Sequence, residues 1–198
     1  MPIRRHTVIT GTGRAGTTFL VELLTHLGLE TGFSTTEASR QKSKIGRAGL
    51  EKDIRQNDCP YIVKSPWFCD YAKEVVHRKD ILIDHIFIPI RNLHAAAESR
   101  RYVTKTGSPE GGLWYTNSTQ RGDQENILLM QLYKLLHAIS DTEIPITLLS
   151  YPRITKDSVY LFNKLKPIMP NTTFKEFQQI FSAVVRPEFV HQFNEDDC

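Results

Sequence analysis

The feature that most constrains this chain is a glycine-rich turn near its N-terminus, which joins an apolar strand to an amphipathic helix. The turn reads Ile9-Thr10-Gly11-Thr12-Gly13-Arg14-Ala15-Gly16-Thr17-Thr18. Its glycines permit positive φ angles and a close approach of the backbone to a ligand. The backbone amides at the start of the following helix favour an anion. The turn therefore predicts a phosphate-binding loop.

The spacing from Gly11 to Gly16 to Thr18 fits the nucleotide-binding P-loop, with one difference. Thr17 stands where the nucleotide-hydrolysing version has lysine. Arg14 supplies a cation inside the loop instead. The loop thus indicates a phosphate-like group other than the β,γ-phosphates of ATP.

Apolar segments typical of strands alternate with helical patterns along the chain. We expect strands at residues 7–10, 61–64, 85–90 and 144–149, and helices near 19–27, 68–76, 93–102 and 127–139, with two more helices after the last strand. Strands separated by helices form a parallel sheet. The sequence therefore predicts an α/β fold, in which a three-layer, P-loop-like arrangement has a central parallel sheet flanked by helices.

Two segments lack this periodicity, residues 34–58 and 106–123, and we expect both to cover an active site because long loops in compact domains are usually functional or disordered. The first segment is rich in basic residues: Arg40, Lys42, Lys44, Arg47, Lys52 and Arg55. These form either a docking site for an anionic acceptor or an ordinary solvated face. Trp114 and Tyr115 in the second segment either stack on a ligand ring or anchor the loop to the core.

Composition narrows the class of protein. A chain of 198 residues suits a single domain, residues 1–198. Its 25 Lys and Arg against 22 Asp and Glu give a net charge of +3, which offers no case for nucleic-acid binding. Three widely spaced cysteines match neither a disulfide framework nor a zinc ligand set, and no run of about 20 apolar residues suggests a membrane span. We expect a soluble cytoplasmic protein without a metal, and its oligomeric state stays open.

A second motif follows the third expected strand. Arg91 closes that strand, and Ser99 stands eight residues later in a helix. Ligands of open parallel sheets collect at the carboxyl ends of strands, so we expect Arg91 near the glycine-rich turn. Its planar guanidinium can bind a phosphate through two hydrogen bonds, and the serine hydroxyl can add a third. Taken alone, the pair also fits a surface arginine and a tolerated helical serine.

Together the two motifs resemble the sulfotransferase family, which uses 3′-phosphoadenosine 5′-phosphosulfate (PAPS) as donor. In that family the turn holds the 5′-phosphosulfate, which implies this role for Gly13, Arg14, Ala15, Gly16, Thr17 and Thr18. An arginine followed eight residues later by a serine holds the 3′-phosphate there, which implies that role for Arg91 and Ser99. The resemblance covers residues 7 to about 101.

The family also has a lysine at the end of an intervening strand, and Lys64 in Tyr61-Ile62-Val63-Lys64-Ser65-Pro66-Trp67-Phe68 is similar to the version of glycan-directed members. Two departures stand against this match. Small-molecule members have a catalytic histidine two residues after the lysine, where this chain has Pro66. Their late basic, glycine-containing loop has no counterpart after Tyr151.

The resemblance implies transfer of a sulfuryl group from PAPS to an acceptor hydroxyl of a small molecule or a glycan. By analogy with phosphoryl transfer, Arg14 and Lys64 would neutralise the leaving 5′-phosphate, without a metal. A base must accept the hydroxyl proton. Glu37 is the residue that the glycan-directed members suggest, Glu30 is its competitor, and a merely solvated Glu37 is as good an interpretation.

Two other functions stay open. In a P-loop kinase or nucleotide hydrolase, Thr18 would hold magnesium and Asp84 would be the second metal carboxylate, although Thr17 replaces the expected lysine. A catalytically inactive protein that binds PAP or PAPS is the third hypothesis, suggested by Pro66.

Overall fold

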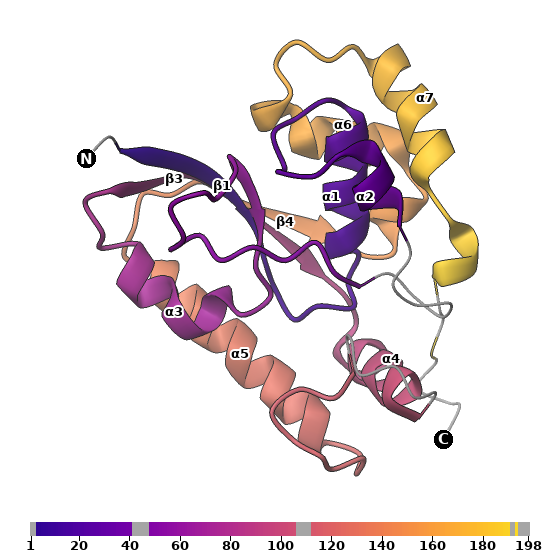
Figure 1. Cartoon of the computed structure of the whole chain (residues 1–198). Helices are drawn as coiled ribbons and strands as arrows, with labels where there is room; N and C mark the ends of the chain where they lie inside the picture. Colours follow the sequence, from indigo (N-terminus) through magenta and orange to yellow (C-terminus); the bar gives the residue numbers. More distant parts are fainter. Residues whose placement is uncertain (1–2, 41–47, 106–111, 191–192, 194–198) are drawn as a thin grey trace.

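A computed structural model describes residues 3–40, 48–105, 112–190 and 193. It has an all-parallel sheet of four strands in the order β2-β1-β3-β4, with helices on both faces (Figure 1). The expected α/β fold with a central parallel sheet is thus confirmed. None of the described helices is both long and apolar enough to cross a membrane.

The strands are β1 (Arg4–Ile9), β2 (Ile62–Lys64), β3 (Ile81–Ile90) and β4 (Ile146–Ser150). In the register of the sheet, Ile9 of β1 lies beside both Lys64 and Phe87. The third strand begins four residues before the expected 85–90. Polar Asp84 interrupts the apolar pattern in the sequence, but Arg5 of β1 donates two hydrogen bonds to it, at 2.8 and 3.1 Å, and this pairing keeps it within the strand.

The α-helices are α1 (Thr17–His26), α2 (Thr35–Ser39), α3 (Phe68–Val75), α4 (Leu93–Lys105), α5 (Asp123–Ile139), α6 (Ser158–Leu165) and α7 (Phe174–Val184), with short 3-10 turns η1 (Arg153–Thr155), η2 (Lys166–Ile168) and η3 (Pro187–Phe189). Helix α2 lies in a segment without helical periodicity. This helix forms for a local reason, because Ser34 and Glu37 make a reciprocal capping box around a single turn.

The sheet separates two apolar cores, and β3 contributes to both because successive side chains of a strand point to opposite faces. Phe87 packs in the core with residues of α1, α6 and α7, whereas Ile86 and Ile88 pack in the core with residues of α3 and α5. Figure 1 shows these two groups of helices on opposite sides of the sheet. The result is a three-layer arrangement with the strand ends between the layers.

The fully buried Phe177 of α7 provides a test of the first core. Phe177→Ala removes a ring and leaves a cavity, and we expect it to lower the free energy of unfolding by about 3–5 kcal/mol in urea titrations. Val159→Ala on the exposed side of α6 is the control, with an expected change within about 0.5 kcal/mol. Similar losses in both variants would contradict this packing.

Candidate functional site

The carboxyl ends of all four strands lead to one cavity of about 450 Å³. Strand β1 runs into the glycine-rich turn, β2 ends at Lys64, and β3 and β4 are followed directly by Arg91 and Tyr151. Residues from each of these strand ends line the cavity. The parallel topology therefore brings together segments that are far apart in the sequence.

The glycine-rich turn has a positive φ at four positions, 132° at Gly11, 68° at Gly13, 53° at Arg14 and 86° at Gly16. Gly16 is the N-cap of α1, no side chain caps this helix end, and the first turn contains no acid. Its amides are thus suited to an external anion. Gly13 has a second reason to be glycine, because a Cβ there would lie 2.5 Å from Nη2 of Arg100.

Lys64 reaches from β2 to the start of α1. Its ammonium donates to Oγ1 of Thr18 at 2.8 Å, to the carbonyl of Gly49 at 2.5 Å and to a carboxylate oxygen of Glu51 at 2.7 Å. The lysine is only 4 % exposed. The cation that the loop lacks at Thr17 is therefore supplied by the neighbouring strand.

Arg14 contacts both Ser99 and Arg91 at the cavity wall. Nε of Arg14 donates to the hydroxyl of Ser99 at 3.1 Å, and Nη1 of Arg91 donates to the carbonyl of Arg14 at 2.9 Å. The guanidinium of Arg91 also lies 4.9 Å from the ring centre of Tyr151. Burial lowers the pKa of both arginines, and the charge of Arg91 lowers the pKa of Arg14 further.

Arg100 is a third arginine at this site and comes from α4. Its guanidinium donates to the carbonyls of Thr12 and Gly112, each at 2.7 Å, and lies 4.7 Å from the ring centre of Trp114. Burial, together with the neighbouring charge of Arg14, lowers the pKa of Arg100 to about 9. Positive charge is therefore concentrated beside the turn at an electrostatic cost that an anion would offset.

The charges that line the cavity are strongly unbalanced. Five described lining residues are cationic: Arg14, Lys64, Arg91, Arg100 and Arg186. Among the same described residues, the single carboxylate is Glu51. Such a cavity suits a ligand with more than one negative group.

Most of the expected ligand-binding residues line this cavity: Gly13, Arg14, Gly16, Thr17, Thr18, Lys64, Arg91 and Ser99. Ala15 is different, because it is fully buried and outside the set of described lining residues. Its part in the site is limited to the shape of the turn.

Glu37, the expected base, also lies outside the described cavity lining. Its exposed carboxylate accepts hydrogen bonds from the amide and the hydroxyl of Ser34, at 2.8 and 2.7 Å, and these bonds lower its pKa. The side chain thus caps α2. The competitor Glu30 is exposed in the loop between α1 and α2 and is likewise not a described lining residue.

Asp84, the carboxylate expected for a magnesium site, is within β3 and not at a strand end. Besides Arg5, the hydroxyl of Tyr61 donates to it at 3.1 Å. It is absent from the described cavity lining. The arrangement therefore does not bring Asp84 to Thr18.

The basic residues of segment 34–58 do not share one role. Lys42, Lys44 and Arg47 lie outside the described residues. Arg55 is structural, because it pairs with Asp53 at 2.7 Å and lies 4.1 Å from the ring centre of Tyr71.

The two aromatic residues of the second long segment, Trp114 and Tyr115, also have different roles. Trp114 is buried and lines the cavity, so it both anchors the segment and borders the ligand space. The exposed Tyr115 instead donates a hydrogen bond to Asp70 of α3.

Several lining residues were not singled out from the sequence as site residues: Glu51, Trp67, Arg100, Tyr151 and Arg186. Tyr151 had a usable signal, since it directly follows a strand of a parallel sheet. Arg186 comes from the segment at η3, which borders the cavity although no glycine-containing loop stands there. Glu51 lies in a segment without periodicity and offered no signal.

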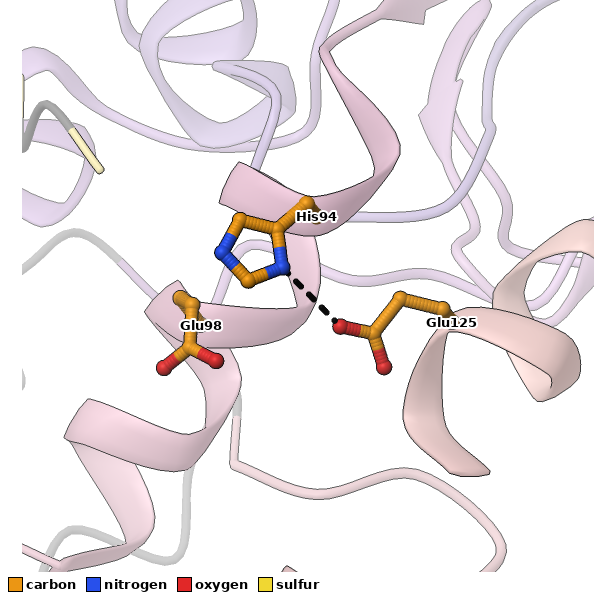
Figure 2. A group of neighbouring side chains, drawn as sticks. All are labelled: His94, Glu98 and Glu125. Atoms are coloured by element: carbon orange, nitrogen blue, oxygen red, sulfur yellow. Dashed lines mark hydrogen bonds and ion pairs between the residues drawn. The ribbon is translucent and has the colours of Figure 1, made fainter. Parts of the chain in front are cut away.

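A second polar cluster joins α4 to α5 (Figure 2). Ligand atoms of His94, Glu98 and Glu125 lie within 4.8 Å of one another, close enough for a metal ion. However, Arg101 donates to Glu98 at 2.8 Å and to Glu125 at 3.0 Å, and His94 contacts Glu125 at 3.3 Å. The carboxylates are thus already compensated, and the cluster braces the helix that carries Ser99 and Arg100.

No protein-family model, curated protein or solved structure matches this chain. The functional argument therefore depends on the site itself.

The brace between α4 and α5 predicts a pH-dependent contribution to stability. Burial raises the pKa of Glu125, but hydrogen bonds from Arg101 outweigh this and lower it to about 2. A lowered pKa stabilises the fold above the unfolded value of about 4.3 and loses this effect as the pH falls toward 2. We expect Glu125→Gln to cost about 1–2 kcal/mol at pH 7 and about half of that at pH 3, in urea titrations. Exposed Glu143→Gln is the control, and a loss independent of pH would contradict the role of ionised Glu125.

Proposed function

We propose that this chain is a PAPS-dependent sulfotransferase, which transfers a sulfuryl group to an acceptor hydroxyl of a small molecule or a glycan. The observation that carries the proposal is the charge of the cavity, where five cationic side chains face one carboxylate among the described lining residues. Two groups of polar side chains stand out in the lining. Lys64 contacts the start of α1, whereas Arg14 contacts both Ser99 and Arg91.

These two groups fit the two anionic ends of PAPS. The amides of residues 16–18 and the ammonium of Lys64 would hold the 5′-phosphosulfate. Arg91 and Ser99 would hold the 3′-phosphate. Because the guanidinium of Arg14 contacts Ser99, we assign Arg14 to the 3′-phosphate side, although the sequence suggested the 5′-phosphate. The aromatic walls, Trp67 and Trp114, offer apolar surfaces for the rings of the ligands.

When bound, PAPS supplies a sulfuryl group on a phosphate leaving group. The residues of this chain would contribute position and charge. Lys64 is oriented by its bonds to Thr18 and Gly49, and a phosphate would replace Glu51 as the third partner of its ammonium.

The rival P-loop kinase has less support. Thr17 replaces the lysine of that motif, and Asp84 pairs with Arg5 outside the described cavity lining. A catalytically inactive protein that binds PAP or PAPS shares the same site. Turnover separates it from the transferase.

The two-group assignment predicts how ligands stabilise the protein. PAP without magnesium should raise the thermal midpoint more than AMP does, because PAP alone carries the 3′-phosphate, and a ligand at about 100 times its dissociation constant adds roughly 2.7 kcal/mol. Arg91→Ala should weaken PAP by at least about tenfold in calorimetric titrations and leave AMP nearly unchanged. Arg153→Ala, which removes an exposed arginine paired with Asp157, is the matched control.

Two outcomes would contradict the assignment. Equal weakening of PAP and AMP would make Arg91 a structural residue. Stabilisation only by ATP with magnesium would favour the kinase.

Lys64 provides the test of transfer itself. With labelled PAPS and a panel of sugar and phenol acceptors, the wild-type protein should form a sulfated product, and Lys64→Ala should lower the rate by at least about 100-fold. PAP binding without any transfer by the wild type would identify the inactive nucleotide-binding protein instead.

A further inference from the structure

Glu51 is the carboxylate of the cavity, and nothing in the proposed binding of PAPS uses it. Its oxygen lies 2.7 Å from the ammonium of Lys64, and its side chain stays 27 % exposed. Lys64 is itself almost fully buried. The carboxylate therefore lies at the point where the buried cation meets the open space of the cavity.

The backbone around Glu51 is attached to Lys64 on both sides. The carbonyl of Gly49 accepts from the Lys64 ammonium, and the amide of Lys52 donates to the Lys64 carbonyl at 3.0 Å. Between them, Leu50 has a φ of 65°, a left-handed conformation that is strained for a residue other than glycine. This conformation is held by the surrounding contacts, since Leu50 packs against the core of α1 and α7. Glu51 is thus positioned by the fold.

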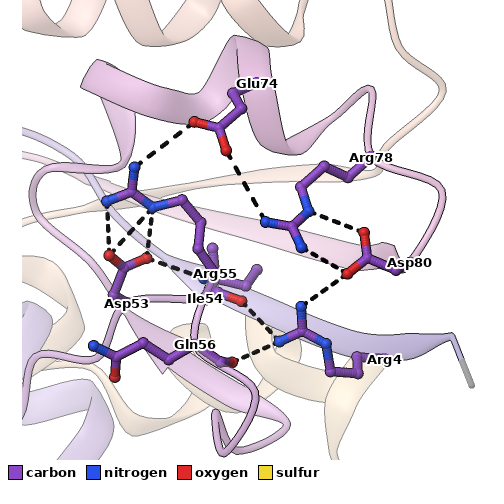
Figure 3. Close-up of polar contacts among 8 residues, drawn as sticks. All are labelled: Arg4, Asp53, Ile54, Arg55, Gln56, Glu74, Arg78 and Asp80. Atoms are coloured by element: carbon purple, nitrogen blue, oxygen red, sulfur yellow. Dashed lines mark hydrogen bonds and ion pairs between the residues drawn. The ribbon is translucent and has the colours of Figure 1, made fainter. Parts of the chain in front are cut away.

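The chain after Glu51 is anchored as well (Figure 3). Ile54 is fully buried, and its carbonyl accepts from Nη1 of Arg4 on β1 at 3.3 Å. Arg55 pairs with Asp53 at 2.7 Å and with Glu74 of α3 at 3.7 Å. Anchors on both sides of Glu51 fix its carboxylate relative to β1 and β2, as a reacting group requires.

We infer that Glu51, and not Glu37, is the general base of the transfer; this inference rests on the proposed function. A phosphate that binds Lys64 offers the ammonium a new partner and leaves the Glu51 carboxylate to the acceptor hydroxyl. The hydroxyl proton passes to Glu51 as the acceptor oxygen bonds to sulfur, and the bond from sulfur to the 5′-phosphate oxygen breaks with its electron pair left on that oxygen. The products are a sulfate ester, PAP and protonated Glu51, which then releases its proton to solvent.

The experiment compares Glu51→Gln, Glu51→Asp and Glu37→Gln with the wild type by two measurements. PAP affinity is measured calorimetrically, and conversion of labelled PAPS to PAP is followed with the sugar and phenol panel and with water as the sole acceptor. Glu143→Gln is the matched control, because it removes an exposed glutamate outside the described cavity lining.

For Glu51→Gln we expect PAP affinity equal to the wild type within about threefold, or tighter, because Lys64 loses a competitor. The conversion rate should fall by at least about 100-fold. Glu51→Asp keeps a carboxylate and should retain conversion about tenfold above Glu51→Gln. This pattern separates a base from a residue that only orders the pocket, whose loss would weaken PAP and spare the rate of bound protein.

Retained conversion in Glu51→Gln, or loss in Glu37→Gln alone, would overturn the role of Glu51 and leave the transferase intact. Weaker PAP binding by Glu51→Gln at an unchanged maximal rate would overturn it too. A wild-type protein that binds no PAP, or leaves PAPS intact with every acceptor and with water, would refute the proposed function and this inference together.

Discussion

The guanidinium of Arg100 connects the glycine-rich turn to α4, and the geometry of the anion site depends on that contact. It bonds the carbonyls of Thr12 and Gly112 and occupies the space that a side chain at residue 13 would need. The contact is costly, because burial and Arg14 lower the pKa of this arginine to about 9. The stacked ring of Trp114 offsets part of that cost. Arg14 and Arg100 therefore bring positive charge to the turn at a cost that a bound anion would lower.

The parallel sheet places the other residues of the cavity beside this contact. Each strand delivers one segment to the same edge, and the register that places Ile9 beside both Lys64 and Phe87 aligns the lysine with the turn. Helix α4, which carries Arg100, is held against α5 by the ion pair of Arg101 with Glu125. The cations are thus carried by regular elements and their immediate ends, so their positions are well defined.

Local patterns in the sequence indicated the four strands, six of the seven helices and the residues of the two phosphate motifs. Lys64 and Arg91 do lie at one cavity, as strand-end positions in a parallel sheet predict, and Ser99 of α4 lies there too. The carboxylate of the cavity could not be found from such local patterns. Glu37 is used by its own helix as a cap, whereas the cavity carboxylate is Glu51, held by contacts with β2 that no local pattern records.

The sequence by itself determined the α/β architecture and the glycine-rich turn, because strand propensity, helical periodicity and glycine conformations are properties of neighbouring residues. Only the tertiary structure decided which charges meet. Lys64 brings its ammonium to Thr18 from 46 residues away, and Arg100 supports the turn from 88 residues away. Such pairings arise from the order and register of the strands, and the spacing of residues that are close in sequence does not specify either.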